Sequence, residues 1–383
     1  MTRGAIARAV VPPLLAFALA RSVLGAAALS AGVAPSRPGS WCRFDCAHYV
    51  RIALHGYELA PCPADSHDAG LWCGNAAWLP GYPLLIRAAH SLGMSPRGAA
   101  LAVSAAFALA ALGLLWLALA GPLSGTAVPS RAAAAAALGL AAFFPGTVYA
   151  HALSPLGVFG CAVVASLLLA AGGRPIAAGL AGAAAAFTYP PGFLLPPVLA
   201  AGFLLGPGTL ALRVRRGATA AALSAAGLAA VAALQYVDTG EWRAFALVQG
   251  DYHYSLRNPI VSLAERIGPL LRPPFAGASE ALAGQTLLVL LLVAAAAGGA
   301  LAAARASAFA ARERFVGLYV IAAWLLPLVI GEEEGGLHRR EAALLPLVLL
   351  TARLPAPLQA VLAGAAAVVA YGVALLFFRG QLV

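Results

Sequence analysis

The stretch that decides the fold is WCRFDCAHYVRIALHGYELAPC at residues 41–62, followed by DSHDAGLWCGNAAWLPGYPLLIR at residues 65–87. It gathers carboxylates, histidines, aromatic side chains and four of the five cysteines, whereas the sequence on both sides is strongly apolar. A polar stretch between long apolar segments indicates a loop at one face of a membrane. Concentrated polar groups at such a face mark the place where chemistry is expected.

The composition agrees with a membrane protein. Of 383 residues, 62% are hydrophobic and only 10% are charged, and the mean hydropathy is +0.88. These values lie far outside those of an average soluble domain. No polar stretch is long enough to form a soluble domain, so we predict one all-α domain over residues 1–383, a polytopic bundle of transmembrane helices.

Hydrophobic segments near the length of roughly 20 residues that a bilayer requires predict about eleven spans. The segments at 175–189 and 341–352 are short enough for re-entrant or broken helices, and the Pro190-Pro191 pair is a further possible break. The predicted spans are 9–32, 99–120, 132–150, 155–172, 175–189, 191–210, 217–236, 284–304, 315–331, 341–352 and 356–378.

Charge predicts the orientation. With a cytoplasmic N-terminus, the inner side carries many arginines against a single carboxylate, Glu313, and the positive-inside rule favours this arrangement. The loops 33–98 and 237–283 then face outward. The net charge of +10 is thus a signature of orientation, and we predict no nucleic-acid partner. The inner arginines are Arg3, Arg8, Arg131, Arg174, Arg213, Arg215, Arg216, Arg305, Arg312, Arg314 and Arg353.

The cysteines of the first outward loop are expected to form disulfides. Cys42, Cys46, Cys62 and Cys73 lie on the oxidising side of the membrane, which favours two disulfides over a metal site. Zinc held by Cys42, Cys46 and His48 is the alternative. Three connectivities are possible, and we favour Cys62 with Cys73 and Cys42 with Cys46. We predict no metal site and no cofactor, because no phosphate loop, nucleotide fingerprint or metal-binding helix motif is present.

Two short amphipathic helices are predicted within this loop. Residues 46–57 place Tyr49 and Ile52 on one side and His48 and Arg51 on the other, and residues 83–91 begin with a proline. Both suit helices that lie along the membrane surface and cover the spans as a lid.

The first loop resembles that of PIG-V-like mannosyltransferases, which are enzymes of the GT-C fold. Asp45, His48-Tyr49, Arg51-Ile52-Ala53 and Gly56-Tyr57 match the family pattern W-D-x-x-x-Y-x-x-I-A-x-x-G-Y, and Trp78 to Leu85 resembles F-F-P-L-Y-P-L. Weaker resemblances to further family motifs follow in the same order along the chain. They lie at Phe143-Phe144-Pro145, Tyr189-Pro190-Pro191-Gly192, Thr239-Gly240 with Phe245 and Gln249, and Arg339 with Pro346. The sequence departs from the family where Tyr189 replaces the usual Arg, and where His151, Ser154 and Pro155 stand in the region of a family Glu.

The resemblance implies transfer of a sugar from a polyprenyl-phosphate carrier to an acceptor hydroxyl of a lipid or glycan, with inversion. Such transfer needs a base near the hydroxyl and cations near the departing phosphate. Asp45 is the candidate base, although an Asp before a helix is also a good N-cap. Arg339 and Arg340, with His338 beside them, are candidates for the donor phosphate. Alternatively, Glu332 to Glu334 simply neutralise these arginines.

A substrate groove is expected to include aromatic and amide side chains, because aromatic faces cover the apolar faces of sugars. An interfacial aromatic belt is the alternative, which we favour for Trp242. The groove candidates are His48, Tyr49, Tyr82, Tyr189, Gln249 and Tyr252.

The sequence therefore predicts a multi-pass glycosyltransferase in the plasma membrane of a bacterium, with the active-site loop outside and membrane lipids around it. The bacterial assignment rests on the absence of lysine and the abundance of alanine and glycine, which are typical of a genome rich in G and C. A catalytically silent relative with a binding or assembly role is one alternative. A lipid or glycan transporter is another, although apart from Arg21 the spans lack the ionisable residues expected of one.

Overall fold

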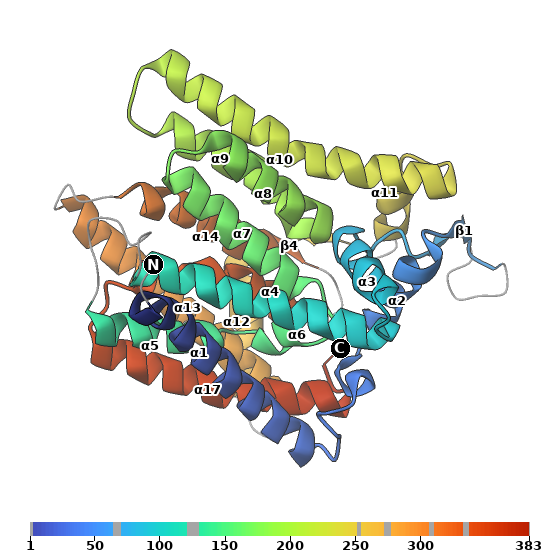
Figure 1. Ribbon diagram of the computed structural model, residues 1–383, viewed down its shortest axis with the longest axis horizontal. Coiled ribbons are helices and arrows are strands. Elements are labelled where there is room, and N and C mark those ends of the chain that lie inside the picture. Colours follow the sequence, from blue (N-terminus) through green and yellow to red (C-terminus); the bar gives the residue numbers. More distant parts are fainter. Residues whose placement is uncertain are drawn as a thin grey trace.

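The computed structural model describes residues 3–63, 70–120, 130–250, 254–271, 277–305, 310–331 and 337–382. Within these residues the chain is a bundle of helices, shown in Figure 1, with two small two-stranded sheets. Five helices are long and apolar enough to cross a membrane. They are α1 (Arg3–Ser30), α4 (Pro96–Leu119), α10 (Leu210–Thr239), α13 (Ala278–Arg305) and α17 (Ala356–Arg379).

Shorter helices fill the rest of the bundle. Those in the apolar segments are α5 (Arg131–Ala142), α6 (Thr147–His151), α7 (Leu156–Ala171), α8 (Pro175–Thr188), η2 (Pro190–Leu194), α9 (Leu195–Leu204), α14 (Ala311–Val329), α15 (Leu337–Glu341), η5 (Ala342–Leu347) and α16 (Val348–Thr351). Those in the predicted outward loops are η1 (Pro38–Trp41), α2 (Cys46–His55), α3 (Gly81–Ser91), α11 (Ala244–Gln249), α12 (Pro259–Ile267) and η4 (Gly268–Leu271). The prediction of a polytopic all-α bundle is confirmed.

Besides the segment 191–210, which begins in η2 after the Pro190-Pro191 pair and continues as α9, two of the predicted spans are interrupted. The segment 132–150 divides into α5, which ends at Ala142, and α6, which begins at Thr147. Gly146, at the N-cap of α6, adopts φ 78°, a left-handed conformation that favours glycine. The segment 341–352 contains η5 and α16, with Pro346 inside η5. Pro346 has no backbone N–H to continue an α-helix. Both breaks lie near the site described below.

The helix boundaries follow from local chemistry. Ser95 begins α4, and its hydroxyl accepts a hydrogen bond from Gly98 N at 3.2 Å. Thr209 caps α10 in the same way. At the other end of α10, Gly240 takes φ 75° and closes the last turn. These are the usual start and stop signals of helices.

The first predicted outward loop is a small structured unit. The strands β1 (Leu59–Pro61) and β2 (Trp72–Gly74) form an antiparallel pair in which Ala60 lies opposite Cys73. A disulfide joins Cys62 to Cys73 beside this pair, and a second joins Cys42 to Cys46 at the start of α2. These are the two pairings favoured from the sequence. The Cys42–Cys46 disulfide uses both sulfur atoms that the alternative zinc site would need. Disulfides stabilise loops that bury little apolar surface of their own.

Side-chain contacts join the helices of this loop to each other and the loop to the end of α10. The guanidinium of Arg87 on α3 donates to the carbonyl oxygens of Ala53 and Ile52 at the end of α2, at 2.7 and 3.1 Å. The backbone N–H of Tyr57 donates to the Asp238 carboxylate at 2.9 Å, which joins the first outward loop to the second. The strands β3 (Ser255–Leu256) and β4 (Ile330–Gly331) pair as well, so the second loop is tied to the chain before α15.

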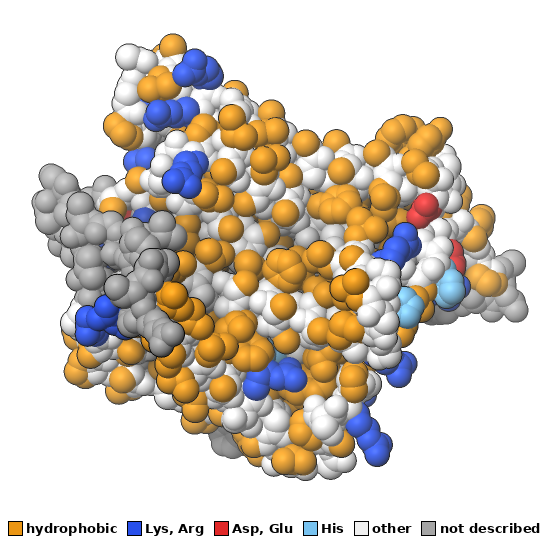
Figure 2. Space-filling model, in the orientation of Figure 1, with side chains coloured by type: hydrophobic (Ala, Val, Ile, Leu, Met, Phe, Trp, Pro, Cys, Tyr) orange, Lys and Arg blue, Asp and Glu red, His pale blue; other side chains and the backbone are white. Residues whose placement is uncertain are grey.

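Polar groups gather at one end of the bundle. Figure 1 shows α2, α3 and β1 together at that end, whereas the N-terminus lies toward the other. On the face seen in Figure 2, the middle is mainly apolar and the acidic and histidine side chains lie toward α2 and α3. This is the distribution expected when hydrocarbon surrounds the middle of the bundle.

The close approach of α3 to α8 yields a testable prediction. A Cβ on Gly81 would lie 2.9 Å from the carbonyl oxygen and the Cα of the two residues at the end of α8, Phe187 and Thr188. Gly81→Ala should therefore force the helices apart and destabilise the protein by about 1–3 kcal/mol. Gly113→Ala is the control, because no atom lies within 4 Å of its Cβ position. Thermal unfolding in detergent should show a lower midpoint for Gly81→Ala only. Equal midpoints would contradict the packing described.

Candidate active site

Asp45 and Arg339, which are far apart in the sequence, form an ion pair. Asp45 lies directly before α2, and Arg339 lies in α15; Nη1 of the arginine contacts Oδ2 of the aspartate. The side chains are 38% and 30% exposed, so water reaches both. Burial lowers the pKa of Arg339, but its interactions with the Asp45 carboxylate and with nearby tyrosines raise it, and the net shift is upward. The guanidinium therefore stays charged.

The N-cap interpretation of Asp45 is not what the structure shows. Asp45 occupies the N-cap position of α2, but its side chain makes no capping hydrogen bond, and its own backbone is helical. A capping Asp would accept from a backbone N–H of the first turn. Its carboxylate is instead directed at Arg339.

Both residues of this ion pair line a cavity of about 30 Å³. Aromatic side chains surround it, with Tyr49 from α2, Tyr149 from α6, Tyr189 after α8 and Phe377 from α17. The Tyr149 hydroxyl is buried and has no hydrogen-bond partner among the described residues. Burial and the charge of Asp45 raise the pKa of Tyr49, so that hydroxyl stays protonated. The cavity is thus lined by a carboxylate, a guanidinium and phenol groups that can donate hydrogen bonds.

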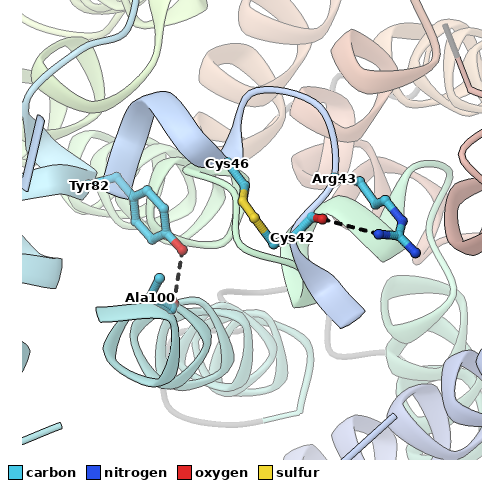
Figure 3. Close-up of a disulfide and its surroundings, with 5 residues drawn as sticks. All are labelled: Cys42, Arg43, Cys46, Tyr82 and Ala100. Carbon is cyan, nitrogen blue, oxygen red and sulfur yellow. Dashed lines mark hydrogen bonds between the residues drawn. A yellow bond between two sulfur atoms is a disulfide. The ribbon is translucent and has the colours of Figure 1, made fainter. Parts of the chain in front are cut away.

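Arg43 is a second cation at the cavity that sequence reasoning missed. Its Nη2 donates to the Phe378 carbonyl oxygen at 3.1 Å, and its buried Nε has no partner among the described residues. Figure 3 shows Arg43 next to the Cys42–Cys46 disulfide, which brackets Asp45 in the sequence. The sequence offered one indication of this role, because Arg43 lies two positions before the candidate base. An arginine in a loop, however, does not by itself indicate a functional site.

The backbone at Phe44 is unusual. Its φ is 53°, and among the described residues it is the one non-glycine residue with positive φ. Such a conformation is costly for a bulky side chain and tends to occur at functional sites. It turns the chain between Arg43 and Asp45, and both side chains line the cavity.

A buried glutamine fixes the position of α15. Gln285 of α13 accepts a hydrogen bond from Gly146 N at 3.0 Å through Oε1. Its Nε2 donates to the His338 carbonyl oxygen at 3.0 Å and to the Glu341 carboxylate at 2.6 Å. These bonds join the break between α5 and α6 to both sides of Arg339, so they set the position from which Arg339 reaches Asp45.

Several predicted site residues lie outside this cavity. His338 is buried beside the Tyr149 ring, and burial, reinforced by the charge of Arg339, lowers the pKa of its imidazole, which is therefore neutral. Arg340 lines a different small cavity with Glu341. His48 stacks on Trp78 with ring centroids 3.6 Å apart.

Three further groove candidates also lie away from this cavity or outside the described residues. Tyr82 is fully buried, and its hydroxyl donates to the Ala100 carbonyl oxygen at 2.9 Å (Figure 3), so it packs α3 against α4. The Gln249 side chain accepts from the Tyr254 hydroxyl at 2.7 Å on the surface. Tyr252 lies outside the described residues. Of the predicted residues, Asp45, Arg339, Tyr49 and Tyr189 are thus brought together.

The fold is similar to that of a solved membrane protein. The structure of ArnT from Cupriavidus metallidurans bound to undecaprenyl phosphate has a TM-score of 0.54 and 14% identity, covering 96% of this chain and 76% of that one. The apo state of ArnT gives 0.51 and 15%, covering 90% and 71%. No protein-family model and no curated protein sequence matches the chain. The chain has the fold of GT-C membrane glycosyltransferases.

A double-mutant cycle tests the ion pair. Because both side chains are partly exposed, Asp45→Asn and Arg339→Gln should show a coupling free energy of only about 1 kcal/mol in unfolding. The pair of Arg51 and Glu58 is the control, since its side chains are 60% and 48% exposed and should couple less. The free energies would be measured by denaturant titration in detergent micelles. Strictly additive effects at Asp45 and Arg339 would contradict the contact.

Proposed function

We propose that this protein is a membrane glycosyltransferase that moves a sugar from a polyprenyl-phosphate carrier to an acceptor hydroxyl, with inversion. The observation that carries the proposal is the meeting of Asp45 and Arg339 in one cavity at the polar end of a GT-C fold. These are the two residues that the sequence resemblance assigns to base and donor phosphate. The ArnT structure with undecaprenyl phosphate supports a lipid-phosphate donor for this fold.

In this mechanism the acceptor oxygen attacks the anomeric carbon of the sugar while the bond from that carbon to the phosphate oxygen breaks. Asp45 takes the proton of the acceptor hydroxyl, and the polyprenyl phosphate leaves with the bonding electron pair. A single displacement inverts the anomeric centre. General-base catalysis of this kind contributes roughly 10²- to 10⁴-fold in rate.

Donor binding would change the partner of Arg339. In the structure its guanidinium is occupied by Asp45, and a donor phosphate offers a stronger, two-point partner. When Arg339 moves to the phosphate, the Asp45 carboxylate becomes free to accept the hydroxyl proton. The cavity of about 30 Å³ holds no sugar as it stands, so this exchange accompanies an opening of the site.

Arg43 compensates for the departure at Tyr189. The family pattern has an arginine there, and in this chain the tyrosine lines the cavity without supplying charge. Arg43 faces the same cavity and brings a second guanidinium to it. Two cations around one phosphate suit the charge that develops on the leaving group.

The identity of the sugar and the family of the related enzyme are proposed from the sequence resemblance alone. We propose mannose as the sugar and a PIG-V-like enzyme as the relative, because the first-loop motif is similar to that family. We also propose that the protein lies in a bacterial plasma membrane with its N-terminus in the cytoplasm and the cavity outside. The acceptor would be a lipid or glycan on the outer face.

A catalytically silent relative is the second candidate. Tyr189, Ser154 and Pro155 stand where the family pattern differs, and all three line the cavity. Such a protein would bind the lipid-phosphate sugar without transferring it. The variants below separate binding from transfer and so distinguish the two candidates.

Asp45→Asn should lower the rate of transfer by about 10²- to 10⁴-fold while donor binding is retained, because the amide cannot take a proton. Purified protein in vesicles, a labelled polyprenyl-phosphate sugar and an acceptor extract provide the assay. Glu58→Gln is the matched control, since this exposed carboxylate of the same loop pairs with Arg51 away from the cavity. If Asp45→Asn transferred at the wild-type rate, the mechanism would lose its base. If the wild type bound the donor but formed no product, the silent relative would be favoured.

Arg43→Gln and Arg339→Gln should each raise the donor KM and lower kcat, because a phosphate clamp acts in both the ground state and the transition state. We expect about a tenfold loss of donor affinity for each, the size of one charge-assisted contact. Arg51→Gln, in the same loop but facing away, is the control. An unchanged KM in Arg43→Gln would remove that residue from the proposed phosphate site.

A further inference from the structure

A second cavity lies far from the ion pair, at the opposite end of α14. It has a volume of about 240 Å³ and is formed by α9, α13, α14 and the end of α16. The other end of α14 leads through β4 to α15 and the candidate active site. At 1.5 Å per residue, Arg314 of this cavity lies roughly 22 Å along the helix from Val329, the last residue of α14.

The walls of this cavity are apolar and continuous with the outer surface of the bundle. Leu205 is 65% exposed and Ile321 is 58% exposed, although both line it. In a membrane-spanning bundle, exposed leucine and isoleucine side chains face hydrocarbon. The cavity is therefore accessible from the lipid rather than from a water-filled channel.

Charged groups close one end of the cavity. Glu313 is buried, and its carboxylate accepts from Arg353 Nη2 at 2.5 Å and from Ala310 N at 2.9 Å. Its charge is thus compensated. Arg314 also lines the cavity; its Nε donates to the Gly202 carbonyl oxygen at 2.8 Å, and among the described residues it forms no ion pair. The lining carries more positive than negative charge.

We propose that this cavity binds one anionic phospholipid, with an acyl chain in the apolar part and the phosphate at Arg314. Charge complementarity selects this occupant, because a guanidinium that lacks a carboxylate partner at the membrane interface attracts an anionic headgroup. A zwitterionic lipid offers the same chains without the net charge. The site is separate from the proposed sugar transfer, and its occupation does not depend on that function.

Two variants separate the headgroup contact from the chain contact. Arg314→Gln removes the cation, whereas Gly317→Leu places a side chain in the cavity without changing charge. No atom lies within 4 Å of the Cβ position of Gly317, so the larger residue meets open space rather than the packed core. Arg215→Gln is the matched control, an exposed arginine near the start of α10 that does not line the cavity.

Native mass spectrometry of the full chain, titrated with phosphatidylglycerol or with phosphatidylcholine of the same chains, measures the binding. We expect one phosphatidylglycerol to bind about fivefold more tightly than phosphatidylcholine, which is the effect of one arginine near an anionic headgroup. Arg314→Gln should abolish this preference, Arg215→Gln should keep it, and Gly317→Leu should weaken both lipids.

Equal affinity of the wild type for the two lipids would overturn the proposal, as would an equal loss of preference in Arg215→Gln and Arg314→Gln. If Arg314→Gln could not be purified in folded form, Gly317→Leu would decide the question. Unchanged binding of phosphatidylglycerol by that variant would show that the chain does not enter the cavity.

Discussion

The cost of placing an ionised side chain in hydrocarbon governs the arrangement of this molecule. On the face seen in Figure 2, the acidic and histidine side chains lie toward α2 and α3 and arginines lie toward both ends, whereas the middle is mainly apolar. Apolar helices of this kind pack closely through small residues. At Gly227 of α10, an added Cβ would lie 2.3 Å from the Ala183 carbonyl oxygen of α8. The scaffold is thus rigid in its middle and carries its chemistry at its ends.

The same cost explains how the candidate site is held. Arg339 is partly buried, so it requires a partner, and Asp45 supplies the opposite charge from a loop that two disulfides stabilise. Three hydrogen bonds join Gln285 to the backbone N–H of Gly146, to the His338 carbonyl oxygen and to the Glu341 carboxylate, so they link both sides of Arg339 to α13. A buried amide with its partners satisfied is stable, whereas the Tyr149 hydroxyl and Arg43 Nε have none among the described residues. The unsatisfied groups face the cavity or border it, where a substrate could satisfy them.

The sequence predicted the helical membrane bundle because hydrophobicity over roughly 20 residues is a local property. It also singled out Asp45 and Arg339, through the motif and the position of each in a loop. Their contact could not be derived from composition or periodicity, because it depends on how α15 lies against α2. Tyr82 shows the converse. A tyrosine in a motif suggested a groove, but burial against α4 uses its hydroxyl for packing. The short length of the segment 341–352 indicated a possible broken helix, and η5 is found there with Pro346 inside it, whereas the interruption next to Gly146 was not predicted.

The distribution of the cavity residues along the chain has a consequence for synthesis. Arg43 and Asp45 come from the first loop, Tyr149 and Tyr189 from the middle, and Arg339 and Phe377 from the last segments. A ribosome must therefore translate the chain at least through Phe377 before the cavity can close, since contacts so distant in sequence cannot form earlier. A chain that terminated before α15 would insert most of its helices and leave Asp45 facing water without its arginine. The integrity of the site thus reports that synthesis has proceeded through α17.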